Sequence, residues 1–247
     1  MAAEEDLGVW VYALARADRA QDRTAGLRGV AGEPVRVVVA GDLAAVVGTV
    51  ELDEFRGAGL RRNFSDADWF AAKARAHNAV VSAVRRGGSV FPVRPATIYR
   101  DDWRVCQLLS KEHEEIQAAL RRISGREELG VKVYADPKSI AVQGDLRGRR
   151  QLASQYEGYR MAVAEADRVH TALMRCAVEG KRKPSTNGGA AAKGPSTILN
   201  GSYLVDDDGV EQFVETITAL ERSTARIKLE VTGPWPPYSF AEDMIAI

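Results

Sequence analysis

Residues 226–240 read RIKLEVTGPWPPYSF and join two unlike patterns. Apolar and charged side chains alternate over residues 226–231, which is typical of a strand that faces a core on one side. The next nine residues, 232–240, contain three prolines, one glycine and three aromatic side chains. Gly233 allows the chain to turn sharply, and each proline lowers the entropy that the segment loses on ordering. The stretch therefore predicts a strand followed by a preorganised aromatic tail.

The aromatic tail has three candidate roles: a ligand for a groove on another protein, the wall of a binding pocket, or a plug for the protein's own core. Pro234 and Pro237 have the P-x-x-P spacing of segments that bind polyproline grooves, but such segments usually lie in exposed polar linkers. This tail directly follows a strand with an apolar face, and an aromatic ring buries roughly 150–250 Å² when it is covered. We therefore favour a tail that folds back and pins two domains, with room for one aromatic face to meet a partner. The candidate residues for this packing or interaction are Trp235, Pro236, Pro237, Tyr238 and Phe240.

Upstream of the tail, strand and helix patterns alternate. Strands are predicted at 129–135 and 198–205, and a long helix with a heptad-like apolar seam is predicted from about residue 148 to 179. A second helix follows residue 208, and residues 226–231 add the last strand. The order strand, helix, strand, helix, strand is close to a ferredoxin-like α+β unit.

The first half of the chain is also predicted to mix strands and helices. Residues 9–14, VWVYAL, are apolar on both faces and predict a strand that is covered on both sides. Residues 34–40 and 43–51 predict a hairpin. The extended residues 89–99 contain two prolines, which favours an edge position or a bulge over a central strand. One apolar stripe predicts a single helix over 101–123.

Capping residues mark two further helix starts. Ser65 is followed three residues later by Asp68, and Asp208 is followed by Glu211, so each pair has the spacing of a capping box. The side chain of the first residue in each pair is predicted to accept a hydrogen bond from the first turn of its helix.

These patterns together predict an α+β fold with two domains and a tail. The N-terminal domain spans 1–125, and the C-terminal domain, a modified ferredoxin-like unit, spans 126–232. The polar, Gly-rich residues 181–196 of the second domain predict a mobile loop. The tail, 233–247, is expected to pack back on the domains.

The charge and composition of the chain exclude several classes of protein. Its 247 residues contain 34 Lys and Arg against 34 Asp and Glu, so the chain lacks the basic excess of a general nucleic-acid binder. A net charge of zero also allows self-association or a partner-covered surface. The sequence contains no apolar run of the roughly 20 residues that a membrane span needs. Cys106 and Cys176 fit a reducing compartment, so we expect a cytoplasmic protein.

The sequence offers no candidate catalytic, cofactor-binding or metal-binding residues. His77 and His170 lie on apolar helical faces and are interpreted as packing residues, whereas His113 lies in a charged run and is interpreted as solvated. None of the three histidines has a second ligand at metal-binding spacing, and the chain has no phosphate-binding glycine loop. Cys106 follows an apolar stripe and is interpreted as a buried thiol.

Several motifs resemble the GvpL/GvpF family of gas vesicle proteins. The strongest match is LEVTGPWPPYSF, residues 229–240, and LNGSYLVD, residues 199–206, resembles the preceding family motif. His77 stands where the family has a helix histidine. VFPVRPATIY, residues 90–99, and ELGVKVYAD, residues 128–136, resemble two family strands, although the first has Pro-Ala-Thr where Phe-Gly-Thr is usual and the second has Leu where Trp is common.

The resemblance, which covers roughly residues 8–243, implies a role in building gas-filled protein compartments. It implies an accessory or structural protein, without enzymatic activity or cofactor, that associates with the hydrophobic shell protein and with other accessory Gvp proteins during vesicle nucleation or wall formation. It also implies a location in the cytoplasm in association with the gas vesicle. A ferredoxin-like regulatory module that binds a small ligand is the alternative, because that fold hosts many functions.

Overall fold

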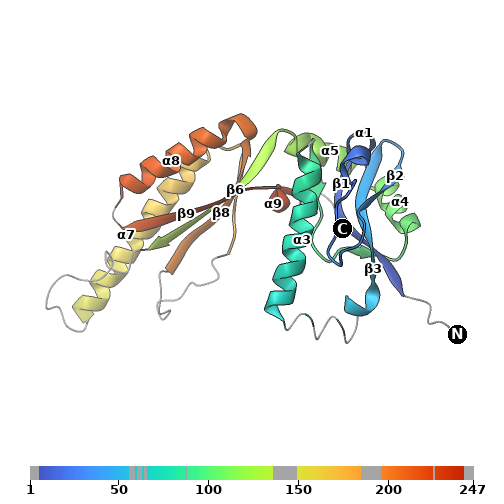
Figure 1. Cartoon of the computed structure of the whole chain (residues 1–247). Helices are drawn as coiled ribbons and strands as arrows, with labels where there is room; N and C mark the ends of the chain where they lie inside the picture. Colours follow the sequence, from blue (N-terminus) through green and yellow to red (C-terminus); the bar gives the residue numbers. More distant parts are fainter. Residues whose placement is uncertain are drawn as a thin grey trace. The chain divides into compact units, whose positions relative to one another are not determined.

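The computed structural model of the chain describes residues 6–55, 59, 63, 66–86, 88–135, 149–184, 196–224 and 226–241. The chain divides into two compact units (Figure 1). One unit comprises Met1–Gly125 together with Pro236–Ile247, and the other comprises Arg126–Trp235. Each unit contains one antiparallel sheet and several helices. The mixed helix and strand composition that the sequence predicts is therefore confirmed.

The sheet of the N-terminal unit has the strand order β2-β3-β1-β4, and β5 also pairs with β1. All of these pairings are antiparallel. The proline-containing segment forms two short strands, and β4 lies at the end of the order, as its prolines predict. The strands are β1 (Leu7–Arg16), β2 (Arg36–Ala40), β3 (Leu43–Glu51), β4 (Val90–Pro92) and β5 (Ile98–Tyr99).

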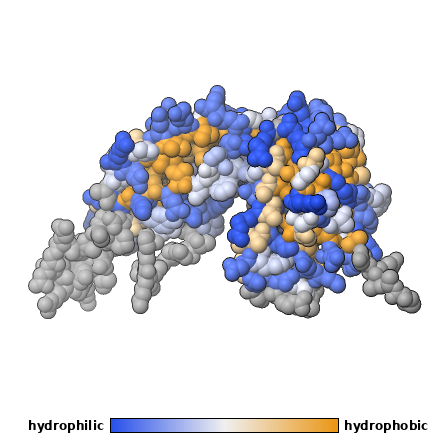
Figure 2. Space-filling view, viewed as in Figure 1, coloured by the Kyte–Doolittle hydropathy of each residue, from blue (hydrophilic) through white to orange (hydrophobic). Residues whose placement is uncertain are grey.

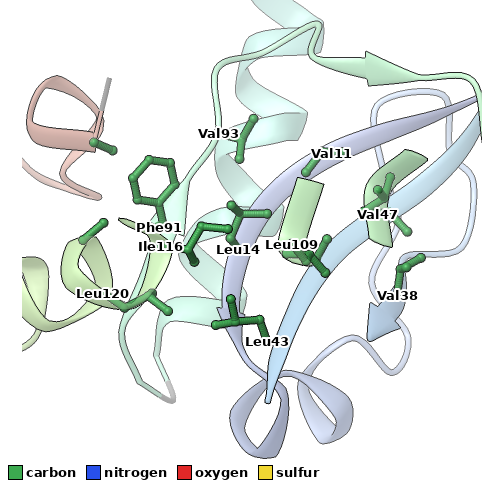
Figure 3. Close-up of a cluster of buried hydrophobic side chains, with 14 of the residues drawn as sticks. Val11, Leu14, Val38, Leu43, Val47, Phe91, Val93, Leu109, Ile116 and Leu120 are labelled. Carbon is green, nitrogen blue, oxygen red and sulfur yellow. The ribbon is translucent and has the colours of Figure 1, made fainter. Parts of the chain in front are cut away.

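Strand β1 is buried on both faces, as its apolar sequence predicts. Val11 and Leu14 belong to one core cluster, which Figure 3 shows. Tyr12 and Ala13 belong to a second cluster on the other face. The pairing of β1 with β3 shifts between Val11 and Ala13, so the bulge lets two successive side chains enter the same cluster.

Helices cover both faces of this sheet. The cluster of Figure 3 receives buried side chains from α4 (Asp102–Lys111) and α5 (His113–Ile123), and the second cluster receives them from α3 (Ala67–Arg85). A short helix, α1 (Ala17–Ala20), follows β1. The prediction of a single helix over 101–123 is wrong, because the helix is interrupted at Glu112, which separates α4 from α5.

The C-terminal unit has the strand order β7-β8-β6-β9, again antiparallel throughout. The core of this unit lies between one face of the sheet and the helices α7 and α8, and Phe213 and Tyr203 are among its fully buried side chains. The elements in chain order are β6 (Arg126–Ala135), α7 (Arg149–Leu173), β7 (Glu179–Arg182), β8 (Ser196–Asp206), α8 (Val210–Arg222) and β9 (Ile227–Trp235).

The second half of the chain departs from its sequence pattern in three places. The long helix ends at Leu173 and not near residue 179. Its predicted apolar face is not buried along the whole helix, since Tyr156 is 68% exposed. The expected loop 181–196 begins within strand β7 and ends in β8, while its residues 185–195 lie outside the described residues. The sheet of this unit therefore contains one strand, β7, that the sequence pattern does not predict.

The two predicted capping boxes also need correction. Asp66 is the N-cap of α3, and its carboxylate accepts hydrogen bonds from the backbone N–H of Asp68 (2.9 Å) and Trp69 (3.1 Å). Ser65, the predicted cap, lies outside the described residues. The N-cap of α8 is Gly209, which has no side chain, so Asp208 does not cap that helix.

Replacing Asp66 with alanine should lower the free energy of unfolding by about 1 kcal/mol, because two backbone donors of α3 lose their acceptor. The matched variant Asp208→Ala should change it by less than about 0.5 kcal/mol. Chemical denaturation of both variants measures the difference. Equal losses in the two variants would contradict the assigned caps.

Candidate functional site

The aromatic tail leaves the C-terminal sheet at Trp235 and continues into the N-terminal unit from Pro236. Pro236 and Pro237 are buried, and a short helix, α9 (Tyr238–Ala241), follows them. The carbonyl of Pro237 accepts hydrogen bonds from the backbone N–H of Phe240 (3.2 Å) and Ala241 (3.1 Å). The prolines therefore begin the turn that α9 completes.

Side chains of α9 enter the core of the N-terminal unit. Phe240 is 1% exposed, and Ala241 belongs to the cluster of Figure 3. Tyr238 packs against the second cluster and donates a hydrogen bond from its hydroxyl to Oδ1 of Asn78 on α3 (3.4 Å). Burial raises the pKa of Tyr238, which keeps its hydroxyl protonated. Because α9 also packs against β4, it covers the edge of the sheet at which β4 lies.

Trp235 differs from the other tail aromatics, because its residue is 46% exposed at the end of β9. It pairs with Glu128 of β6. Gly233, two residues earlier, has a φ of +110°, and a Cβ at this position would lie 2.8 Å from the carbonyl oxygen of Glu128. Glycine is therefore required at residue 233 both by its backbone conformation and by the close approach of β6.

His77 lies under the tail in a hydrogen-bonded arrangement that fixes its protonation. The indole N–H of Trp10 donates to Nδ1 of His77 (2.9 Å), so Nδ1 carries no proton. Nε2 lies 2.9 Å from the carbonyl oxygen of Val93 and therefore donates to it. Burial lowers the pKa of His77 to about 4. The ring of Tyr238 is 6.2 Å away, so this neutral histidine joins β1, α3 and the tail.

A second buried polar group, centred on Tyr12, was not evident from the sequence pattern. The Tyr12 hydroxyl donates to Oε1 of Glu33 and accepts from the backbone N–H of Val30 (2.9 Å). The other carboxylate oxygen of Glu33 accepts from the N–H of Ala31 (2.8 Å). Burial raises the pKa of the Tyr12 hydroxyl, and the hydrogen bond to Glu33 raises it further. A tyrosine within an apolar strand needs a partner for its hydroxyl, and that requirement is the signal that could have found Glu33.

The other two histidines also have defined contacts. His113 on α5 lies with Nε2 2.7 Å from Oδ1 of Asp42, and this hydrogen bond raises the pKa of His113. His170 lies with Nδ1 2.7 Å from the hydroxyl oxygen of Tyr203, and partial burial lowers the pKa of His170. Within the described residues, no group of three or more His, Cys, Asp or Glu side chains is arranged to hold a metal ion.

The remaining surface offers exposed apolar side chains and shallow grooves. Trp103 on α4 is 60% exposed beside a groove that Cys106 also lines, and the Arg104 guanidinium lies 5.1 Å from the Trp103 ring centre. Figure 2 shows apolar residues gathered where α7 and α8 lie, and Val214 of α8 is 41% exposed. In the part of the chain that the structure describes, no helix combines the length and apolar character that crossing a membrane requires.

The two ends of the tail should differ in their effect on stability. Phe240→Ala should lower the free energy of unfolding by about 3–5 kcal/mol, because it removes a fully buried ring from the core. Trp235→Ala should cost less than about half of that, since nearly half of the residue is in contact with solvent. Thermal and chemical denaturation measure both variants. A Trp235→Ala loss as large as that of Phe240→Ala would contradict the difference in burial.

Stability should fall in acid because His77 resists protonation in the native state. An unfolded histidine titrates near pH 6.5 and native His77 near pH 4, so the unfolded chain binds an extra proton between these values. The contribution is fully present above pH 6.5, and about 3 kcal/mol of it is lost as the pH falls to 4. Free energies of unfolding measured across this range should therefore fall less steeply in His77→Gln. His113→Gln is the control that should keep the steep fall, and equal slopes for wild type and His77→Gln would refute the assignment.

Comparison with known proteins places this arrangement in one family. The model of the family "Gas vesicle synthesis protein GvpL/GvpF" matches residues 8–242. Gas vesicle protein L of Streptomyces sp. (strain CB03234) is 38% identical over 231 residues, which is 87% of this chain and 86% of that protein. Gas vesicle protein F of the same strain is 28% identical over 252 residues, 96% of this chain and all of that protein (100%).

Solved structures show the same fold. The crystal structure of gas vesicle protein GvpF from Anabaena sp. PCC7120 aligns with a TM-score of 0.70 at 16% identity and covers 96% of each chain. The structure of GvpF from Microcystis aeruginosa aligns with a TM-score of 0.67 over 95% of this chain and 99% of that one. Because the family model matches residues 8–242, the chain belongs to the GvpL/GvpF family of gas vesicle synthesis proteins.

Proposed function

We propose that this chain is an accessory or structural protein of gas vesicle assembly. It associates with the hydrophobic shell protein and with other Gvp proteins in the cytoplasm while the vesicle is nucleated or its wall is formed. The observation that carries the proposal is the family match over residues 8–242. The identity to gas vesicle protein L, 38%, exceeds that to gas vesicle protein F of the same strain, 28%, and supports an L-type role.

The proposed organisation has an N-terminal α+β domain and a C-terminal domain of the ferredoxin-like kind, joined by the tail. The strand order β7-β8-β6-β9, with α7 and α8 on one face, supports the second assignment, because a ferredoxin-like sheet has its first and third strands in the centre. Burial of Phe240 within the N-terminal unit supports a tail that fixes the end of the chain to the unit in which the chain begins.

We assign the partner-facing part of the tail to Trp235. Its neighbours Pro236 and Pro237 are buried, and so is Phe240, whereas Trp235 is 46% exposed. Exposed tryptophans are frequent anchors of protein interfaces, because a rigid ring buries a large area at little entropic cost. The backbone at the end of β9 is held against β6 by the close approach of Gly233 to Glu128 and by the pairing of Trp235 with Glu128. The Trp235 ring therefore extends from an ordered strand.

Complementation of a gene deletion tests the proposed function. Deleting the gene from a gas vesicle cluster should abolish or deform the vesicles, and the wild-type gene should restore them. Trp235→Ala should restore them poorly, and purified Trp235→Ala should capture the shell protein at least about tenfold more weakly than wild type while remaining folded. Electron microscopy of the vesicles and pull-down with the shell protein are the measurements.

Trp103→Ala is the matched control, since it removes an exposed tryptophan from a different surface, α4, and should leave capture unchanged. Normal vesicles in a deletion strain that has no second gene of this family would refute the assembly role. Full capture by folded Trp235→Ala would refute the assignment of Trp235 and leave the assembly role standing.

A further inference from the structure

Strand β9 forms one edge of the C-terminal sheet. Among the described strands, β6 is its hydrogen-bonded neighbour, and β9 ends the order β7-β8-β6-β9 (Figure 1). The backbone groups on the outer side of an edge strand are a template for another strand. Natural proteins often block such an edge with a bulge, a proline or a charged side chain, although a charge that lies directly opposite one of opposite sign stabilises the pairing. In β9 the proline, Pro234, and the register shift both lie toward the end of the strand, whereas residues 227–231 contain no proline and pair with β6 without a shift.

The sequence of this edge, IKLEV, complements itself when it is reversed. An antiparallel pair of two such strands centred on Leu229 places Lys228 opposite Glu230 and Ile227 opposite Val231. The charged positions, Lys228 and Glu230, share the exposed face of the strand, and the apolar positions share the face toward the core. Val231 is 36% exposed although it lies on the apolar face, so this face has room for further burial.

We propose that the outer edge of β9 binds β9 of a second copy of this chain, antiparallel and centred on Leu229. The contact is isologous, because one surface meets itself about a two-fold axis. Each Lys228 then faces the partner's Glu230, and each Val231 packs beside the partner's Ile227. The product is a continuous eight-stranded sheet with both sets of helices on one face.

The neighbours of β9 within the sheet favour this alternation of charge. Glu230 lies opposite Lys132 of β6, and its carboxylate accepts a hydrogen bond from the Tyr134 hydroxyl (3.0 Å). In the paired copies, Glu230 would lie between Lys132 and the partner's Lys228. Cross-strand pairs of opposite charge stabilise antiparallel strands, whereas like charges directly opposite each other destabilise them.

The start of β9 is held in place before any partner binds. Arg226 Nη1 lies 3.0 Å from Oε1 of Glu165 on α7, and the Thr224 hydroxyl donates to the other oxygen of that carboxylate. Ile227 and Leu229 are 5% and 6% exposed, so the strand is anchored to the core through its apolar face. An edge that is already ordered loses little conformational entropy when another strand pairs with it. The balanced charge of the chain, 34 basic against 34 acidic residues, also places no net repulsion between two copies.

Charge reversal tests the pairing directly. Sedimentation velocity of the full chain over a range of concentrations should show a monomer–dimer equilibrium. Lys228→Glu sets two glutamates against each other twice per dimer, and Glu230→Lys does the same with two lysines, so each should raise the dimer Kd by at least about tenfold. The double variant K228E/E230K restores the complementary pattern and should restore the dimer. An equimolar mixture of the two single variants should form a mixed dimer.

Two controls separate the pairing from other effects. Glu221→Lys makes the same charge change as Glu230→Lys on an exposed position of α8 and should leave the dimer Kd unchanged. Tyr134→Phe removes the hydroxyl that bonds Glu230 without changing charge, and it too should keep the dimer. Each variant is checked by circular dichroism for a wild-type fold.

A wild-type chain that stays monomeric at all concentrations would overturn the proposal. If Lys228→Glu then weakens the binding of another gas vesicle protein, the edge of β9 binds that protein and not a second copy of this chain. A dimer that is insensitive to both reversals would also overturn it, by assigning self-association to another surface. Rescue by the double variant is the result that only opposed β9 strands predict. The proposal does not depend on the proposed function, because self-association is measured in purified protein.

Discussion

Burial of α9 beside β4 is the contact on which the organisation of the whole chain depends. The strands of the N-terminal sheet all come from residues 7–99, yet the helix that covers one edge of this sheet comes from residues 238–241. The intervening residues 126–235 form the second unit, so the chain leaves the first unit and returns to it. It leaves through β6 and returns after β9, and these strands are neighbours in the C-terminal sheet. The second unit is therefore inserted between two points of the first unit, and its first and last strands are adjacent in its own sheet.

Polar side chains inside the N-terminal unit specify how its elements meet. His77 accepts from Trp10 and donates to the carbonyl of Val93, so it satisfies groups from the central strand and from the chain after β4. Tyr12 links the same strand to the turn at Val30 and Glu33. Buried polar groups that lose their partners are costly, and alternative registers of β1 would leave these groups unpaired. The apolar clusters supply most of the stability, and the two polar groups select one register.

The arrangement of apolar and polar residues along single strands predicted most of what the sequence reveals about the fold. The pattern of Ile227, Leu229 and Val231 predicted β9, and the unbroken apolar run around Tyr12 predicted a strand covered on both faces. Strand β7 escaped prediction because Glu179–Arg182 is polar and half-buried, and it owes its place to its pairing with β8. The break at Glu112 lacks proline and glycine, so only packing reveals it. The aromatic content of the tail predicted that its rings pack against the protein and that one of them can face a partner. It did not predict that Trp235 is the exposed ring and Phe240 the buried one, because those depend on where β9 ends.

The return of the chain to its first unit has a consequence for synthesis on the ribosome. Residues 126–235 form a contiguous unit, whereas the first unit lacks α9 until residues 238–241 have been translated, after the whole of the second unit. Domains that are contiguous in sequence fold as units during synthesis, in order from the N-terminus. Here that order is inverted for the last step, and the unit that is made first is completed last. A chain truncated before residue 238 would therefore carry its defect far away in the sequence, in the sheet built from residues 7–99.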